Sequence, residues 1–338
     1  MADPVGIRPP FTALGRRRFM AAIAGGFLAA PLAAEAQQDR LYRIGVVHQG
    51  GGSYEQALKG LHDGLKELGL EEGKHFVPHV RDAKGDLKGA EEAARNLEAE
   101  KVDVIVTFST STSLAAKRAT KSVPMVFYAG ADPVTVGLVE SIAKPGGRLT
   151  GVYGRTVELT AKRFELLKEM VPRLRRVITF YNPENSTSVR SLKDAREAAR
   201  QLKVELVEKR VTSADELRAA LRALKPGEVD AHFHVADSLL TRHADLVVEA
   251  ARTKKLPTIY QDREVVVRGA LSAYGLSYYA MGRLSAKYVQ RLLQGARPGD
   301  LPIEQLDRLD FINNLKTAKA IGLTIPPLVL RRADEVIE

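Results

Sequence analysis

Residues 102–128 read VDVIVTFSTSTSLAAKRATKSVPMVFY and indicate which class of fold this 338-residue chain adopts. The run 102–108 is almost continuously apolar, which is typical of a strand covered on both faces of a sheet. Residues 112–120 suit a helix, and residues 124–128 return to the strand pattern. A strand, a helix and a second strand in this order predict a parallel βαβ unit.

The same alternation extends along the chain in both directions. Further strands are expected at 43–47, 76–80, 177–181, 204–209, 229–235, 256–259 and 270–273. Helical segments are expected at 86–98, 133–142 (one or two turns), 159–170, 188–202, 214–224 and 240–254. The pattern restarts after the glycines at 146–147, and the chain is longer than one core usually fills. We therefore predict an α/β protein with two Rossmann-like lobes, each built on a parallel sheet.

The N-terminal residues 1–36 are predicted to be an export signal. Arg16 and Arg17 precede the apolar run 19–32, which is shorter than the roughly 17–25 residues that span a bilayer. The run ends on an Ala-Glu-Ala exit, as a secretory signal does. The twin arginine favours the route that exports folded proteins. We expect a mature chain that begins near Gln37 and works in the periplasm; the alternative is a frayed, Ala-rich helix.

The charge and cysteine content exclude several classes of function. The whole chain has a net charge of +10, and because residues 1–36 hold four arginines and two acidic residues, the remainder has +8. These charges are spread along helices without interleaved aromatic residues, so we expect no nucleic-acid partner. The chain has no cysteine, which excludes disulfides, thiolate metal sites and thiol nucleophiles.

The motifs for cofactor, metal and catalytic sites are incomplete. The glycines at 50–52, with Asp82 after the next strand, resemble a dinucleotide loop, but Glu55 replaces the third glycine. His232 and His234 point to the same face of a predicted strand, and zinc would need a third ligand from elsewhere. There is neither a G-x-S-x-G nor an H-E-x-x-H motif. We expect no cofactor, no metal and no catalytic residues.

Polar loops follow the predicted strands, and they are the expected site of ligand binding. Ligands of open parallel sheets sit at the carboxyl ends of the strands. The loops concerned are 48–54, 82–86, 109–112, 129–133, 182–188, 236–238, 261–264 and 274–277. Helices that begin there present free N–H groups, which favour a carboxylate. Two facing sheets would thus enclose a polar cleft.

Short motifs spread over nearly the whole chain resemble one family. They include Ala131-Asp-Pro-Val134, Lys144-Pro-Gly-Gly147, Leu149-Thr-Gly-Val152, Tyr181-Asn-Pro183 and Leu271-Ser-Ala-Tyr-Gly275 with Tyr278-Tyr279. In order and spacing the chain resembles bacterial ABC-transporter substrate-binding proteins of the tryptophan/tyrosine type, which have a type I periplasmic-binding fold. The resemblance implies two lobes joined by a three-stranded hinge, with crossings at 149–152, 270–274 and near 302–310. Lobe 1 would comprise 41–150 plus about 276–303, and lobe 2 would comprise 151–275 plus about 304–338.

The resemblance also implies ligand-binding residues, carried over by position. Asp237 ends a strand of the second lobe and would pair with a ligand ammonium, although an aspartate there also suits a helix N-cap. Ser109, Thr110 and Ser111 match the polar turn that would hold a carboxylate. Gln49 lies in the first of the polar loops.

Four further residues are candidates with a structural alternative. Asp132 would face the ligand, or it would form an Asp-Pro turn. Asn185 and Ser186 would face the cleft, or they would lie in a surface loop. Tyr274 would lay its ring against the ligand at a hinge crossing.

The function implied is that of an exported receptor of an ABC importer, without catalytic activity. It would clamp an amino acid or an aromatic carboxylate between the lobes and deliver it to a membrane permease. We expect a monomer. Two alternatives stay open: an exported oxidoreductase with a nucleotide cofactor, and a ligand sensor that is not coupled to transport.

Overall fold

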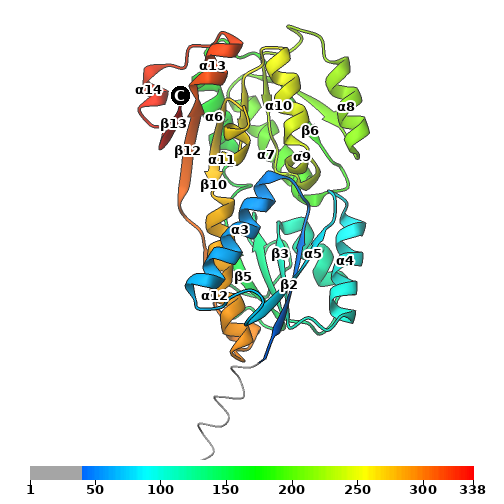
Figure 1. The fold of residues 1–338 in the computed structure, drawn as a ribbon. Helices are drawn as coiled ribbons and strands as arrows, with labels where there is room; N and C mark the ends of the chain where they lie inside the picture. Colours follow the sequence, from blue (N-terminus) through cyan, green and yellow to red (C-terminus); the bar gives the residue numbers. More distant parts are fainter. Residues whose placement is uncertain (1–39) are drawn as a thin grey trace, which may run out of the picture.

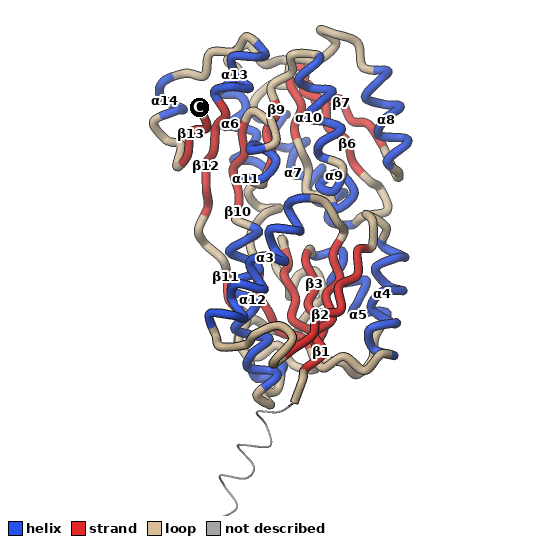
Figure 2. Tube along the Cα trace, viewed as in Figure 1, coloured by secondary structure: helices blue, strands red, loops and turns tan. Residues whose placement is uncertain are grey.

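The computed structural model describes residues 40–338, so the predicted export signal lies outside the described residues. Two lobes are stacked end to end, and the chain passes between them along one side (Figure 1). Each lobe has a central sheet with helices on both faces (Figure 2). No helix in the described part of the chain is long and apolar enough to cross a membrane.

The first sheet has the strand order β11-β5-β4-β3-β1-β2, and all neighbouring strands are parallel. Its strands are β1 (Tyr42–His48), β2 (Phe76–Asp82), β3 (Val104–Phe108), β4 (Met125–Ala129), β5 (Leu149–Tyr153) and β11 (Glu304–Gln305). Helices α3 (Gly52–Glu67) and α12 (Tyr278–Leu293) cover one face, and α4 (Leu87–Ala99) and α5 (Thr110–Ala119) cover the other. A short 3-10 helix, η1 (Pro298–Asp300), precedes β11.

Strand β3 shows why its sequence is almost entirely apolar. Val104, Val106 and Phe108 belong to the core beneath α3 and α12. Ile105 points to the opposite side and belongs to the core beneath α4 and α5. Because successive side chains of a strand face opposite sides, a central strand covered on both faces favours apolar residues along its whole length.

The second sheet has the order β13-β12-β10-β9-β8-β6-β7. Its strands are β6 (Arg176–Tyr181), β7 (Glu205–Arg210), β8 (Ala231–Phe233), β9 (Thr258–Tyr260), β10 (Ser272–Leu276), β12 (Leu309–Asn314) and β13 (Glu335–Ile337). Only β10 and β12 pair antiparallel among the strands described. The helices of this lobe are α6 (Thr160–Met170), α7 (Ser186–Gln201), α8 (Ala214–Ala223), α9 (Ser238–Arg242), α10 (Ala244–Thr253), α11 (Arg263–Val267), α13 (Leu315–Ile321) and α14 (Pro327–Leu330).

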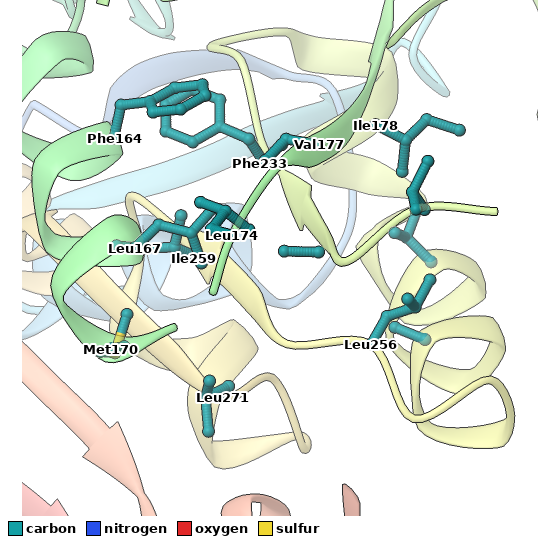
Figure 3. Packing of buried hydrophobic residues seen from close by; sticks show 14 of the residues in the cluster. Phe164, Leu167, Met170, Leu174, Val177, Ile178, Phe233, Leu256, Ile259 and Leu271 are labelled. Atoms are coloured by element: carbon teal, nitrogen blue, oxygen red, sulfur yellow. The ribbon is translucent and has the colours of Figure 1, made fainter. Parts of the chain in front are cut away.

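The largest hydrophobic cluster lies in the second lobe. Figure 3 shows Phe164 of α6 against Phe233 of β8, and their ring centroids are 4.9 Å apart. Met170, Leu174 and Ile259 belong to the same cluster, and all are at most 1% exposed. Each lobe therefore has a core of its own, as the restart of the sequence pattern predicts.

Three connections join the lobes: 154–159 after β5, residue 277 after β10, and 306–308 after β11. The two mainly parallel sheets and these connections confirm the predicted α/β class with two Rossmann-like lobes. Strand β5 continues to Tyr153 and β11 pairs beside it. The first sheet thus extends a few residues beyond the boundaries expected at 150 and 303.

Two predicted helices differ in the structure. Residues 133–137 form hydrogen-bonded turns, and residues 138–142 are bends and irregular backbone instead of a helix. The N–H of Leu138 donates to Pro133 O at 2.8 Å and closes a turn. Gly137 in this turn has φ +76°, which lies outside the α-helical region, so a helix cannot continue through it. The predicted helix 240–254 is two helices, α9 and α10, which meet at His243, where φ is −99° and ψ is 22°.

Candidate functional site

The two sheets repeat one strand order, β2-β1-β3-β4-β5 in the first and β7-β6-β8-β9-β10 in the second. In such sheets the order reverses beside the first strand, and ligands bind in the crevice outside the carboxyl ends of the strands there. The carboxyl ends of both sheets face the junction of the lobes (Figure 1). A cavity lies at this junction.

The cavity is lined by both lobes and is small. Its lining comprises Tyr54, Ser109, Thr110, Ser111, Tyr128, Gly130, Thr156, Val157, Asn185, Thr187, Ala236, Asp237, Ser238, Thr241, Gln261 and Tyr278. The free volume is about 40 Å³. Pockets that bury a small organic ligand have roughly 300–1,000 Å³, so the walls have to separate to admit one.

The N-terminus of α5 forms the polar wall of the first lobe. Ser109 has φ +100° and caps the helix, because its Oγ accepts from the Thr112 N–H at 3.2 Å. Thr110 Oγ1 accepts from the Gly130 N–H at 2.9 Å, which ties the turn to the end of β4. The hydroxyls of Ser109 and Ser111 lie 3.3 Å apart. Free N–H groups and the helix dipole make this wall favourable for an anion.

Three tyrosines form the aromatic wall. The rings of Tyr54 and Tyr278 meet edge to face, with centroids 5.5 Å apart and an interplanar angle of 89°. Tyr128 lies 6.4 Å from Tyr278, and its hydroxyl is 3.2 Å from Thr156 Oγ1. Burial raises the pKa of all three phenols, so they are neutral at physiological pH. Neutral aromatic rings suit an apolar or aromatic part of a ligand.

Asp237 provides the charge of the second-lobe wall. It follows β8, and its Oδ1 accepts from the Leu240 N–H at 3.0 Å, which caps α9. Its Oδ2 accepts from Asn185 Nδ2 at 3.2 Å. The residue is 4% exposed, and burial raises the pKa of its carboxyl. Among the described residues this carboxyl group accepts hydrogen bonds from Leu240 and Asn185 but forms no salt bridge, so its ionised form would lack a cationic partner in the protein.

Direct contacts between the lobes hold the cleft closed. Arg242 Nη1 donates to Asp82 Oδ2 at 2.7 Å and to Gln49 O at 2.9 Å. Ser53 donates to Asp262, and the hydroxyls of Ser111 and Ser238 are 3.4 Å apart. These contacts join protein atoms of the two lobes directly.

The structure brings five of the nine predicted residues to the cavity: Ser109, Thr110, Ser111, Asn185 and Asp237. Both of the roles considered for Asp237 are compatible with this position, since one carboxylate oxygen caps α9 and the other points to Asn185. The structure places the other four residues outside the cavity lining.

Three of those four residues contact other parts of the protein, and the fourth is exposed. Gln49 is buried, and its Nε2 donates to Thr112 Oγ1 at 2.9 Å. Asp132 Oδ1 accepts from the Thr135 N–H at 2.7 Å and forms the Asp-Pro turn. Ser186 is exposed on the first turn of α7. Tyr274 packs against Phe311 with centroids 6.1 Å apart.

Sequence reasoning missed the tyrosine wall and Gln261. Tyr54 and Gln261 lie in predicted polar loops, Tyr128 ends a predicted strand, and Tyr278 belongs to a motif of the resemblance. These positions are the signal that could have found them. No group of three or more metal-ligating side chains occurs in residues 40–338, and His234 stacks on Tyr260 with centroids 4.7 Å apart.

Comparison with known proteins gives several relatives. The tyrosine-binding protein of Clostridioides difficile (strain R20291) is 29% identical over 271 residues, 80% of this chain and 78% of that protein. A conserved domain protein from Vibrio cholerae superposes with a TM-score of 0.81 at 30% identity, covering 88% of this chain and 100% of the other. An ABC domain from Streptococcus pneumoniae in complex with L-Trp gives a TM-score of 0.78 at 24% identity, covering 88% and 100%.

The family comparison covers almost all of the described residues. The profile of the ABC transporter substrate binding proteins matches residues 45–337. This range includes both sheets except the first three residues of β1, all three connections and every residue that lines the cavity. The chain therefore belongs to the family of ABC transporter substrate binding proteins.

Proposed function

We propose that this protein binds an aromatic amino acid between its lobes and delivers it to the permease of an ABC importer. The observation that carries the proposal is the buried carboxyl group of Asp237, which has no cationic partner among residues 40–338 and lines the same cavity as the N-terminus of α5. Burying a charge without a partner is costly, so such a charge indicates a missing counter-ion. A ligand ammonium would be that counter-ion.

The opposite wall suits the carboxylate of the same ligand. The N–H groups at the start of α5 and the hydroxyls of Ser109, Thr110 and Ser111 are donors for an anion. A zwitterionic amino acid therefore matches both polar walls. A molecule with only one of the two charges would leave one wall without its partner.

The aromatic wall supports an aromatic side chain. Tyr54, Tyr128 and Tyr278 present neutral rings whose edge-to-face arrangement can extend to a further ring. One relative is named tyrosine-binding protein and another was solved with L-Trp. These names support an aromatic amino acid for this chain as well.

Opening and closing of the lobes would accompany binding. The three connections at 154–159, 277 and 306–308 are the hinge, and the closed cavity is too small to be entered as it stands. A ligand that fits the closed form better than the open form shifts the lobes towards closure.

The proposal also includes that the protein is exported to the periplasm and acts there as a monomer. The predicted signal in residues 1–36, with Arg16 and Arg17, supports secretion by the twin-arginine route. Substrate-binding proteins of ABC transporters are typically extracytoplasmic, which agrees with export. They are not enzymes, so membership of this family does not favour the oxidoreductase alternative. A sensor that is not coupled to transport differs from this proposal only in its partner.

A thermal-shift screen of the purified chain against the twenty amino acids tests the proposed ligand class. A ligand at a hundred times its Kd adds about 2.7 kcal/mol to the free energy of unfolding. We expect L-Tyr and L-Trp to raise the Tm. Tyramine, which lacks the carboxylate, and 3-(4-hydroxyphenyl)propionate, which lacks the ammonium, are the matched controls and should have little effect. No rise of the Tm with L-Tyr, L-Trp or L-Phe would contradict the proposal.

A further inference from the structure

The side chain of Gln261 has a buried carbonyl oxygen to which no group in residues 40–338 donates a hydrogen bond. Gln261 follows β9, lines the cavity and is 6% exposed. Its Nε2 donates to the hydroxyl of Tyr278 at 3.4 Å. Its Oε1 is shielded from solvent and has no hydrogen-bond partner among the described residues.

We infer that Gln261 Oε1 accepts a hydrogen bond from an N–H or O–H on the ring of the ligand, and thereby selects tyrosine or tryptophan over phenylalanine. This inference rests on the proposed function, because it assumes an aromatic amino acid in the cavity. It adds a specificity-determining residue to that site.

From its position, Gln261 would contact the ring of the ligand and not its charged groups. Its amide contacts Tyr278, which belongs to the aromatic wall. The charged groups have other partners, since Asp237 would take the ammonium and the start of α5 the carboxylate. A ring that lies along the tyrosines therefore brings its edge to Gln261.

The energetics favour a ligand that carries a donor. A buried acceptor without a partner costs free energy, and nearly all such groups in folded proteins are satisfied. The phenol of tyrosine or the indole N–H of tryptophan would satisfy Oε1. Phenylalanine has no polar atom on its ring, so it would leave the acceptor unpaired and bind more weakly.

Calorimetry of the wild-type protein with four amino acids tests this inference directly. The ligands are L-Tyr, L-Phe, L-Trp and 3-(3-benzothienyl)-L-alanine, in which sulfur replaces the indole N–H. We expect L-Phe and the benzothienyl analogue to bind roughly 5- to 150-fold more weakly than their polar counterparts. Equal affinities within each pair would overturn the inference. A second result would also overturn the inference: L-Tyr binds more tightly than L-Phe, but L-Trp and its analogue bind equally. Gln261 would then donate from its Nε2 to the phenol oxygen instead of accepting at its Oε1.

A variant links the preference to this side chain. Gln261→Met keeps the length of the side chain without a hydrogen-bonding amide, and Gln201→Met, at an exposed position of α7, is the control. We expect the ratio of the L-Tyr and L-Phe affinities to fall close to one in Gln261→Met and to stay at its wild-type value in Gln201→Met. An unchanged ratio in Gln261→Met would assign the selection to other residues. If Gln261→Met does not fold, the wild-type series decides.

The failure of the inference can be told from the failure of the proposed function. If none of the four amino acids binds the wild-type protein, the proposed ligand class is wrong and the inference falls with it. If they bind without distinction within the pairs, the ligand class stands and only the role of Gln261 is wrong.

Discussion

Arg242 of the second lobe and Asp82 of the first form an ion pair across the cleft, with Nη1 2.7 Å from Oδ2. The same nitrogen donates to Gln49 O at 2.9 Å. The two side chains are 23% and 36% exposed, so solvent screens the pair and its contribution is modest. Both contacts can exist only when the lobes are close, and they therefore stabilise the closed form independently of a ligand.

Replacing Arg242 should weaken ligand binding although this residue does not line the cavity. Arg242→Ala removes the contacts to Asp82 and Gln49, so the closed form becomes less populated and the apparent Kd rises. At about 1 kcal/mol for a partly exposed pair, we expect about a fivefold increase of Kd, measured by calorimetry with L-Tyr. The matched control is Arg252→Ala, whose pair with Glu249 lies within α10. An effect of equal size in the control would contradict a role of Arg242 in closure.

Asp237→Asn should abolish tight binding and leave the empty protein folded. Removing one partner of a desolvated charge pair costs about 2–5 kcal/mol, or roughly thirtyfold to several thousandfold in affinity. Asparagine caps a helix about as well as aspartate, so the Tm of the ligand-free protein should not fall. Calorimetry and thermal unfolding check the two statements.

The control for this variant is a second N-cap. Asp86 caps α4 in the first lobe by accepting from the N–H groups of Lys88 and Gly89, and it does not line the cavity. Asp86→Asn should leave the affinity unchanged. Wild-type affinity in Asp237→Asn would show that Asp237 only caps its helix.

Acid should destabilise the second lobe through its buried histidines. Burial lowers the pKa of His232 to about 3 from 6.5, and burial likewise lowers that of His234. Below pH 6.5 the unfolded chain therefore binds protons that the folded chain does not take up until about pH 3. The free energy of unfolding must fall as the pH decreases through this range, and it is independent of these groups above it.

His232→Phe isolates the contribution of one of these histidines. Its ring packs between Phe180 and Tyr260, with centroids 5.7 and 5.6 Å away, and its Nδ1 has no partner among the described residues. A phenyl ring can therefore replace it. Between pH 7 and pH 5 the variant should lose about 2 kcal/mol less stability than wild type, as measured by urea unfolding. Parallel pH profiles for the two proteins would contradict the assignment.

The packing of α3 against α12 depends on close approach of the two helices. A Cβ on Gly282 would lie 1.9 Å from Ala57 O, which is backbone and cannot move away alone. Gly282→Ala should lower the free energy of unfolding by about 1–3 kcal/mol through overpacking. In the control Gly89→Ala on α4 the nearest atom is 3.2 Å away, so the loss should be smaller. Urea unfolding of both variants measures the difference.

Features that depend only on residues close together in the sequence could be predicted from it. The apolar run of β3 and the polar turn at Ser109 can be recognised from short windows, because burial on both faces and helix capping are local requirements. The tyrosine wall cannot be recognised in this way. Tyr54 and Tyr278 come from helices far apart in the chain and meet only through tertiary packing. For the same reason the sequence does not show that Gln49 donates to Thr112 and that Tyr274 packs against Phe311, both outside the lining of the cavity.

Processing of the N-terminus gives the last prediction. If residues 1–36 are a twin-arginine signal, the exported protein should begin at or near Gln37, and mass spectrometry of the periplasmic fraction should find that N-terminus. Changing both Arg16 and Arg17 to Lys keeps the positive charge but removes the twin-arginine pair, so export should be lost. Changing Arg8 and Arg18 to Lys is the matched control and should leave export intact. Intact Met1 on protein in the periplasm would show that these residues are not a cleaved signal.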